Sequence, residues 1–168
     1  MQFLEMLTTA PAMVSLFSRT RMTVDYDNNT DMLSGLYLSV TSPWKIGLTA
    51  VGSVRPQAAG GEGGIHLLHT QGGLTVFALV STEFTSERGV SFFSITRYRH
   101  PITERWQLYS SAELYTLWRE QAHVASVERA RLGVEWEGWA FGGALNLGQY
   151  GVDWKTDVNP GAFVRKTF

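Results

Sequence analysis

The chain has 168 residues, a net charge of −1 and no cysteine. Its length suits one domain with a full core, and its near-neutral charge gives no reason to expect binding to nucleic acid. The absence of cysteine excludes a disulfide framework and thiol chemistry. No stretch approaches the roughly 18 apolar residues that a membrane-spanning helix needs. If the chain lies in a membrane it must form a β-barrel, because only helices and closed sheets satisfy every backbone polar group in lipid.

Apolar and polar residues alternate along most of the chain, which predicts an all-β fold. We expect an amino-terminal segment at residues 1–13, in which Phe3–Leu7 forms either a short amphipathic helix or an extension of the first strand. Residues 14–168 are expected to form an antiparallel up-and-down β-barrel of about ten strands, within a range of roughly eight to twelve. These strands are expected near residues 14–25, 35–41, 44–51, 65–69, 74–82, 90–98, 106–114, 132–136, 139–147 and 161–168.

The clearest part of this pattern is a β-hairpin at Leu132–Leu147. A two-residue turn at Glu137-Gly138 would place Trp136 directly opposite Trp139, so that the apolar residues of both strands fall on one face. The other face carries small and polar residues, glycine and alanine among them. Two indoles at the turn end of an apolar stripe are typical of a hairpin in a membrane barrel.

The connections between strands are expected to alternate between short and long. Short turns are expected at residues 41–43, 70–73, 101–103 and 137–138. Longer loops are expected at residues 25–31, 55–64, 84–89, 117–128 and 149–159. Short turns at one rim and long loops at the other are typical of outer-membrane barrels.

Aromatic residues gather beside the predicted short turns, on the apolar face. They are Trp44, Tyr98, Trp106, Trp136 and Trp139. An indole places an apolar ring and a polar N–H at the boundary between lipid and water, so these residues are expected to form one membrane-interface belt. Across its turn, Val40 is expected to pair with Trp44. In the same way, Tyr98 is expected to pair with Trp106.

The opposite face of the predicted strands fits the interior of a narrow barrel. Small residues make room for side chains in a tight bore, and on this face they are Gly35, Gly47, Gly133, Ala140, Gly142 and Ala144. Charged residues on the same face are expected to form a lumen network of Arg19, Arg21, Lys45, Arg97, Arg99, Glu113, Arg131, Glu135 and Arg165. Charges in a narrow lumen must pair or hold water. They either fill and rigidify the bore, or form a cation-rich lumen that binds or passes small anions.

The chain from about residue 14 to its end resembles the small bacterial outer-membrane β-barrel proteins. Its last strand, GAFVRKTF, ends in Phe168, and such barrels commonly finish on an aromatic residue that the barrel-insertion machinery reads. Ala162 and Val164 fit the alternation upstream, whereas Lys166 departs from it unless it snorkels to the interface. The resemblance implies a bacterial outer-membrane location with both termini in the periplasm. It implies the lipid bilayer, lipopolysaccharide and the insertion machinery as partners, and it adds Phe168 to the interface belt.

One group of residues could carry catalysis. Some outer-membrane enzymes that modify lipid A or phospholipids use His with Ser and an acidic partner, and His123, Ser126 and Glu128 lie close together near the long-loop rim. Strict alternation would place His123 on the opposite face from Ser126 and Glu128. No metal site and no cofactor is expected, because His66 and His69 face opposite sides and the chain contains no zinc or phosphate-binding motif.

The sequence therefore predicts an integral outer-membrane β-barrel, either structural or acting as a narrow pore or binding barrel for small polar solutes, with recognition in the longer loops. One alternative is a lipid A or phospholipid deacylase or acyltransferase. A second is a soluble lipocalin-like carrier, whose apolar face would line a cavity for a hydrophobic ligand. A third is a subunit or segment of a larger barrel or membrane assembly. Leu48 and Leu145 are expected to face lipid, and a side chain at Gly142 is expected to clash inside the bore.

Overall fold

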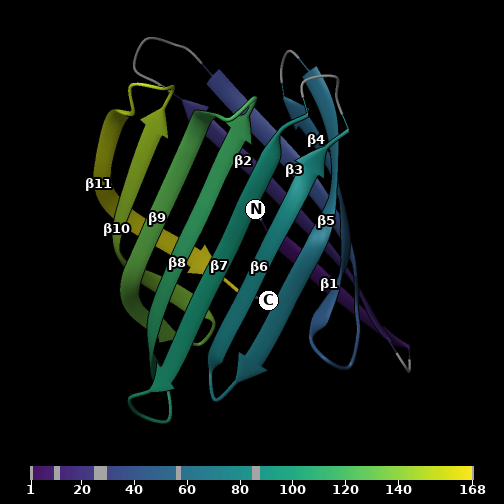
Figure 1. Cartoon of the computed structure of the whole chain (residues 1–168). Coiled ribbons are helices and arrows are strands. Elements are labelled where there is room, and N and C mark those ends of the chain that lie inside the picture. Colours follow the sequence, from purple (N-terminus) through teal and green to yellow (C-terminus); the bar gives the residue numbers. More distant parts are fainter. Residues whose placement is uncertain (1, 10–11, 25–29, 56–57, 85–87, 168) are drawn as a thin grey trace. The chain divides into compact units, whose positions relative to one another are not determined.

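The structure is a computed structural model that describes residues 2–9, 12–24, 30–55, 58–84 and 88–167. It is all-β, as expected, and the described residues form no helix (Figure 1). The eleven strands are β1 (Gln2–Thr9), β2 (Ala12–Val24), β3 (Thr30–Thr41), β4 (Ile46–Arg55), β5 (Ala58–Gln71), β6 (Leu74–Glu83), β7 (Val90–Pro101), β8 (Trp106–Arg119), β9 (Ala122–Trp136), β10 (Trp139–Tyr150) and β11 (Lys155–Lys166). They form one sheet in chain order, which confirms the up-and-down arrangement. The order is linear, and among the described residues no pairing joins β1 to β11 to close a barrel.

The amino-terminal segment is a strand, so the alternative of an amphipathic helix at residues 3–7 is wrong. Strand β1 pairs antiparallel with β2, from Gln2 opposite Arg19 to Thr9 opposite Ala12. Because β1 pairs with β2 along its whole length, its backbone N–H and C=O groups are hydrogen-bonded to protein. An isolated helix of one or two turns would leave most of these groups bonded to water. The added strand makes eleven strands in place of about ten. An even number of strands in a meander returns the chain to the end where it began, and an odd number does not.

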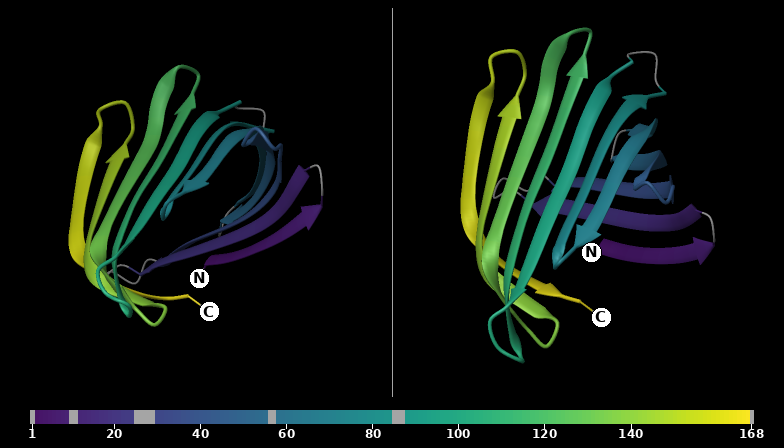
Figure 2. Two further views of the ribbon diagram at one scale, coloured as in Figure 1. Left: turned by 90° about the horizontal axis from the view of Figure 1, so that it is seen from below. Right: turned by 60° about the horizontal axis from the view of Figure 1, so that its bottom comes forward.

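The chain divides into two compact units. Unit 1 comprises Met1–Leu67 and Leu79–Val90, and unit 2 comprises Leu68–Ala78 and Ser91–Phe168. Unit 1 contains the paired strands β1 to β5. Unit 2 contains the paired strands β8 to β11, which Figure 2 shows as successive neighbours from two further directions.

Three of the predicted long loops are wrong, because strands occupy most of their residues. Residues 58–64 of the glycine-rich stretch belong to β5 and pair with β4, from Arg55 opposite Ala58 to Thr49 opposite Gly64. Strands β8 and β9 run to Arg119 and from Ala122, so the loop expected at residues 117–128 is a tight turn. The loop expected at 149–159 is reduced to the turn 151–154 between β10 and β11. Recognition by long loops at these three places is therefore not available to this chain.

An aromatic ring explains how β5 tolerates its glycines. The backbone N–H of Phe84 donates to the carbonyl of Gly61 at 2.8 Å. A Cβ atom built on Gly63 would lie 2.6 Å from Phe84 Cζ, and one built on Gly61 would lie 3.3 Å from Cδ2. The ring therefore covers the glycine backbone and supplies the packing that glycine cannot, which is how an aromatic neighbour offsets the low strand propensity of glycine.

The hairpin expected at Leu132–Leu147 is confirmed. Trp136 lies opposite Trp139, and the turn between them has φ values of 47° at Glu137 and 79° at Gly138. Positive φ at both central residues defines the turn whose twist matches two right-handed strands. The turn between β8 and β9 has the same character, with φ values of 48° at Glu120 and 64° at Gln121.

Two predicted cross-turn pairs are wrong in register, although the faces they implied are correct. Val40 lies opposite Leu48 and not Trp44, which sits in the turn. Strand β7 continues to Pro101, and the backbone N–H of Ile102 donates to the carbonyl of Trp106 at 2.8 Å, so Tyr98 is not the partner of Trp106. The first shift is an even number of residues, and a side chain keeps its face when register moves by two.

Candidate functional site

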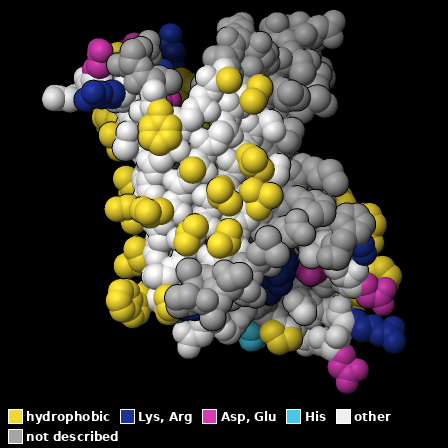
Figure 3. Space-filling view, turned by 90° about the vertical axis from the view of Figure 1, so that its right-hand side faces the viewer, with side chains coloured by type: hydrophobic (Ala, Val, Ile, Leu, Met, Phe, Trp, Pro, Cys, Tyr) yellow, Lys and Arg dark blue, Asp and Glu magenta, His cyan; other side chains and the backbone are white. Residues whose placement is uncertain are grey.

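In unit 1 the exposed face of the sheet is rich in apolar residues, and most of the buried residues are polar, with Val51 and Leu79 as buried apolar exceptions. Exposed residues on these strands include Leu36, Leu38, Val40, Leu48 and Ile65, and Leu48 leaves 67% of its surface exposed. Buried residues on the same strands include Ser39, Thr41, Thr49, His66 and Ser81. A protein that folds in water shows the opposite distribution, with apolar side chains buried and polar ones outside. In Figure 3 the middle of one face carries hydrophobic and uncharged side chains, and the charged ones lie mostly toward its upper left and lower right.

The buried polar groups of unit 1 are joined by hydrogen bonds around His66. Its Nδ1 lies 2.8 Å from Thr49 Oγ1 and its Nε2 lies 2.8 Å from Thr41 Oγ1. Thr49 Oγ1 is in turn 2.8 Å from Ser39 Oγ. Both ring nitrogens are bonded to hydroxyl groups that donate or accept, so these four side chains satisfy one another without a charge. Ser81, also buried in unit 1, instead donates to a carboxylate oxygen of Glu62 at 2.7 Å. The sequence indicates only that His66 is a poor metal ligand, and it does not reveal that His66 bridges Thr41 and Thr49.

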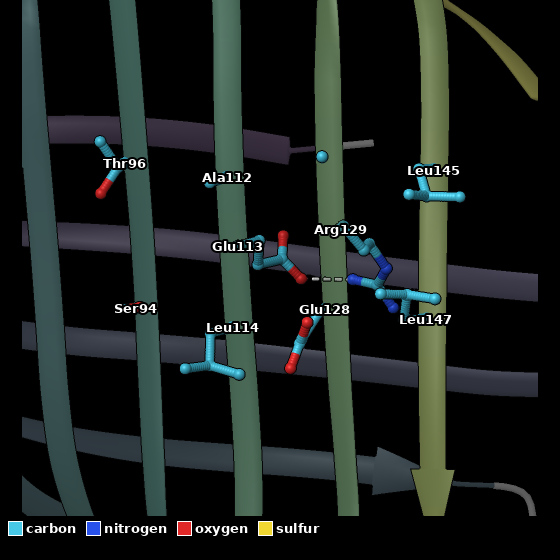
Figure 4. Close-up of a pocket in the computed structure, with 10 residues that line it drawn as sticks. Ser94, Thr96, Ala112, Glu113, Leu114, Glu128, Arg129, Leu145 and Leu147 are labelled. Carbon is cyan, nitrogen blue, oxygen red and sulfur yellow. Dashed lines mark hydrogen bonds and ion pairs between the residues drawn. The ribbon is translucent and has the colours of Figure 1, made fainter. Parts of the chain in front are cut away.

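Unit 2 shows the same inversion with charged groups on its inner face. Exposed apolar residues include Leu132, Trp136, Trp139, Phe141, Leu145 and Val164. Inward-facing charges pair across strands: Arg99 Nε donates to Glu135 Oε2 at 2.9 Å, and Arg129 pairs with Glu113 (Figure 4). Pairing offsets the cost of removing these charges from water.

Most residues of the predicted lumen network lie in unit 2. Six of its members lie on strands of unit 2: Arg97, Arg99, Glu113, Arg131, Glu135 and Arg165. Lys45 is not among them, because it occupies the turn after β3 with φ of 70° and is exposed there. The side chains of Arg19 and Arg21 lie outside the described part of the chain. Arg129 was missed, because it follows directly on the loop expected at residues 117–128.

Some of the aromatic side chains of the predicted interface belt are in contact with one another. Trp106 stacks on Trp136 with ring centroids 6.2 Å apart and meets Phe141 edge-on at 6.1 Å. Lys166 departs from the apolar alternation of the last strand, and its contacts show where its charge lies. Its Nζ donates to the carbonyl of Glu137 at 2.9 Å and lies 4.9 Å from the ring centroid of Trp139. The lysine thus bends back to the rim, as snorkelling requires.

The remaining belt residues are separate from this cluster. Trp44 is 86% exposed in its turn. Tyr98 stacks on His100 with ring centroids 6.1 Å apart. Phe168 lies outside the described residues. The structure therefore brings together three of the six predicted belt residues, Trp106, Trp136 and Trp139, with Phe141 and Lys166 as members that sequence analysis did not include.

A register shift places the predicted catalytic candidates differently from strict alternation. The pairing of β8 with β9 shifts between Leu117 and Trp118, so that Trp118 lies opposite His123 while Thr116 lies opposite Ser126. One residue more on β9 than on β8 turns His123 to the face of Ser126, as a β-bulge does. The expectation that His123 and Ser126 lie on opposite faces is therefore wrong.

His123 and Ser126 form a hydrogen-bonded pair in unit 2. His123 Nε2 lies 2.9 Å from Ser126 Oγ, and His123 Nδ1 lies 2.9 Å from the carbonyl oxygen of Gly151. A carbonyl oxygen only accepts, so with neutral imidazole Nδ1 carries the proton and Nε2 is the nitrogen that can accept from the serine hydroxyl. Ser126 Oγ is also 2.8 Å from Thr116 Oγ1. In that second bond Ser126 is the donor and Thr116 Oγ1 the acceptor. A hydroxyl has one proton, so Ser126 must rotate it away from Thr116 before His123 Nε2 can accept it.

Two tryptophans enclose this pair. The ring of Trp154 lies parallel to that of His123 at 3.8 Å between centroids, and Trp118 meets His123 edge-on at 5.3 Å. As a result His123 is 4% and Ser126 5% exposed. Trp154 belongs to the turn 151–154, which the backbone N–H of Gly151 ties to the carbonyl of Val124 at 2.9 Å. A substrate could therefore reach Ser126 only if side chains around this buried pair moved.

A hollow of about 410 Å³ lies in unit 2, and the paired Glu113 and Arg129 contribute to its lining. Its apolar walls include Leu114, Leu145 and Leu147 (Figure 4). Glu128, the third predicted catalytic candidate, lines this hollow and sits opposite Leu114 on β8 and Leu147 on β10. Glu128 shares the exposed face with Ser126, but the partner of His123 Nδ1 is the Gly151 carbonyl and not a carboxylate.

Comparison with protein-family models, with curated protein sequences and with solved structures finds no match to this chain. Within the described ranges, no group of three or more His, Cys, Asp and Glu residues is arranged to hold a metal ion. A search of the same residues finds no helix with the length and apolar content to cross a membrane.

Proposed function

We propose that the protein is an integral β-barrel of a bacterial outer membrane that acts as a structural barrel or as a narrow pore or binding barrel for small polar solutes. The observation that carries this proposal is the inversion of the two faces: leucine, valine and tryptophan are exposed, while serine, threonine and histidine are buried and hydrogen-bonded. Lipid solvates an apolar exterior, and a polar interior with paired charges is the usual filling of a narrow barrel. Its partners under this proposal are the bilayer, lipopolysaccharide and the insertion machinery that reads the strand ending in Phe168.

The inversion argues against the soluble lipocalin-like alternative. Such a carrier needs its apolar residues around an internal cavity, whereas Leu48, Ile65 and Leu132 are exposed. A larger assembly remains compatible with the proposal, because a linear strand order leaves the outer edges of β1 and β11 to partners.

Extraction and gel mobility test the proposal directly. The protein is expected to stay with membranes through high salt and alkali and to leave them only with detergent. Unboiled and boiled samples are expected to migrate differently in detergent gels, because a folded membrane barrel resists unfolding by the detergent. A protein recovered monomeric and folded in buffer without detergent would contradict the membrane location and restore the soluble carrier.

A second candidate function is hydrolysis of lipid acyl esters, and the His123–Ser126 pair favours it. Ser126 Oγ would attack the ester carbonyl while its proton passes to His123 Nε2, and the Gly151 carbonyl would hold the imidazole through Nδ1–H. The protonated imidazole would then give its proton to the leaving alcohol, and water would release the fatty acid from the acyl-serine. The neighbouring hollow lined by Leu114, Leu145 and Leu147 has the size and polarity to hold part of an acyl chain.

Ser126→Ala tests this candidate in phospholipid and lipid A vesicles. Release of fatty acid by the parent protein is expected to fall to background in Ser126→Ala and in His123→Ala, because both remove a group that bonds to the reacting atoms. Ser110→Ala is the matched control, since Ser110 lies on β8 opposite Leu132 and does not line the hollow. A parent protein that releases no fatty acid from either lipid, or a Ser126→Ala variant as active as the parent, would exclude the hydrolase.

A further inference from the structure

Two guanidinium groups, those of Arg165 and Arg99, lie against one buried phenol in unit 2. Arg165 on β11 donates from an Nη atom to the hydroxyl of Tyr109 on β8 at 3.0 Å. The Cζ atom of Arg165 lies 5.6 Å from the ring centroid of Tyr109, and that of Arg99 on β7 lies 6.0 Å from the same ring. Tyr109 is only 4% exposed. Arg97, two residues from Arg99 on β7, lies within electrostatic range of both Arg99 and Arg165.

One carboxylate pairs with a member of this cluster, Arg99, and another pairs with an arginine outside it. Glu135 accepts from Arg99 at 2.9 Å, and Glu113 pairs with Arg129. Among the residues that the structure describes, Arg165 has no carboxylate within ion-pair distance, and it donates a hydrogen bond to the hydroxyl of Tyr109. A guanidinium has five N–H donors, so most of those on Arg165 have no acceptor in the described protein. Like charges brought together in a partly buried site repel, and an anion placed between them removes that cost.

We infer that Arg165, with Arg97, Arg99 and Tyr109, forms a binding site for a small soluble oxyanion of the carboxylate or phosphate class. The planar fork of arginine matches two oxygens of such a group, and the phenol holds the fork of Arg165 in place. The site lies on the inner face, where only a dissolved ion could enter, and not on the face proposed to meet lipid. This inference rests on the proposed function, because it names the solute class that the inner face would bind or pass.

Titration with inorganic phosphate tests the site. Parent protein is first shown to be folded by its heat-modifiable mobility, and phosphate binding is then measured by calorimetry in detergent at constant ionic strength. Arg165→Gln is expected to weaken binding at least roughly tenfold, because it removes a charge-assisted pair. Arg165→Lys is expected to recover only part of the affinity, since a point charge lacks the fork. Arg105→Gln, in the exposed turn after β7, is the matched control and is expected to bind as the parent does.

The outcomes separate this inference from the proposed function. Folded parent protein that binds no phosphate, or equal losses in Arg105→Gln and Arg165→Gln, would overturn the site. If Arg165→Gln does not fold, Tyr109→Phe decides, because it removes only the hydroxyl that orients Arg165 and is expected to weaken binding several-fold. A protein that is folded and soluble without detergent would overturn the membrane proposal, while the same titration in buffer would still decide whether the site binds an oxyanion.

Discussion

Leu48→Arg is expected to lower the free energy of unfolding in a lipid bilayer by about 2–4 kcal/mol. Leu48 is 67% exposed in the middle of an apolar stripe, between Val40 on β3 and Ile65 on β5. In water, exchange of one exposed side chain for another usually changes stability by less than about 0.5 kcal/mol. In lipid, the guanidinium must instead be carried into hydrocarbon or dragged to the interface. The size of the change in unfolding free energy therefore shows whether the exposed face around Leu48 contacts lipid or water.

Denaturant titration of protein folded into lipid vesicles measures this effect. Ile102→Arg is the control, because Ile102 is also exposed, at 56%, but lies in the turn after β7. The control is expected to change stability little, since a residue at the rim can place its charge in water. Leu48→Arg protein that inserts and unfolds like the parent would show that the exposed apolar face does not contact lipid.

The faces of the strands could be predicted from sequence, because the alternation of side chains survives errors in turn geometry. Val40 pairs with Leu48 and not with Trp44, yet all three were placed on the apolar side. The turn and the register of the hairpin at residues 132–147 could be predicted, because Gly138 supplies the positive φ that a two-residue turn needs and the indoles mark the strand ends beside it.

The lengths of the strands could not be predicted from sequence, because partners elsewhere in the chain decide them. Glycines at residues 60–64 have low strand propensity, but pairing with β4 and the ring of Phe84 hold them in β5. Polar residues at 117–128 were assigned to a loop for the same reason, although Glu120 and Gln121 make a tight turn. Propensity is a weak guide wherever a neighbouring strand supplies the hydrogen bonds.

The pairing of His123 with Ser126 lay beyond sequence analysis, because it depends on a register shift. Period-two reading assumes that every residue of a strand has one partner, and it therefore placed the two side chains on opposite faces. The shift between Leu117 and Trp118 breaks that assumption and brings Nε2 within 2.9 Å of Oγ. A bulge leaves no mark in the alternation that distinguishes it from a short loop.

Gly142→Ala is expected to destabilise the protein by at least about 1–3 kcal/mol, because there is no room for one more carbon. Gly142 lies opposite Gly133 on the inner face of the hairpin. A Cβ atom on Gly142 would lie 2.2 Å from the carbonyl oxygen of Leu132 and 2.5 Å from Gly133 Cα. Both neighbours are backbone atoms, so no side-chain rotation can relieve the contact and the two strands would have to separate.

Gly143→Ala is the matched control for this effect, one residue along the same strand. The nearest atom to a Cβ on Gly143 is the carbonyl oxygen of Leu132 at 4.0 Å, which is ordinary packing distance. Here alanine is expected to stabilise the strand by about 0.5–1 kcal/mol, because it removes the excess backbone freedom of glycine without a clash. Unfolding midpoints in denaturant should therefore move in opposite directions for the two variants. If both moved upward, the close approach of β9 and β10 would be wrong, and with it the tight inner face that small residues were inferred to serve.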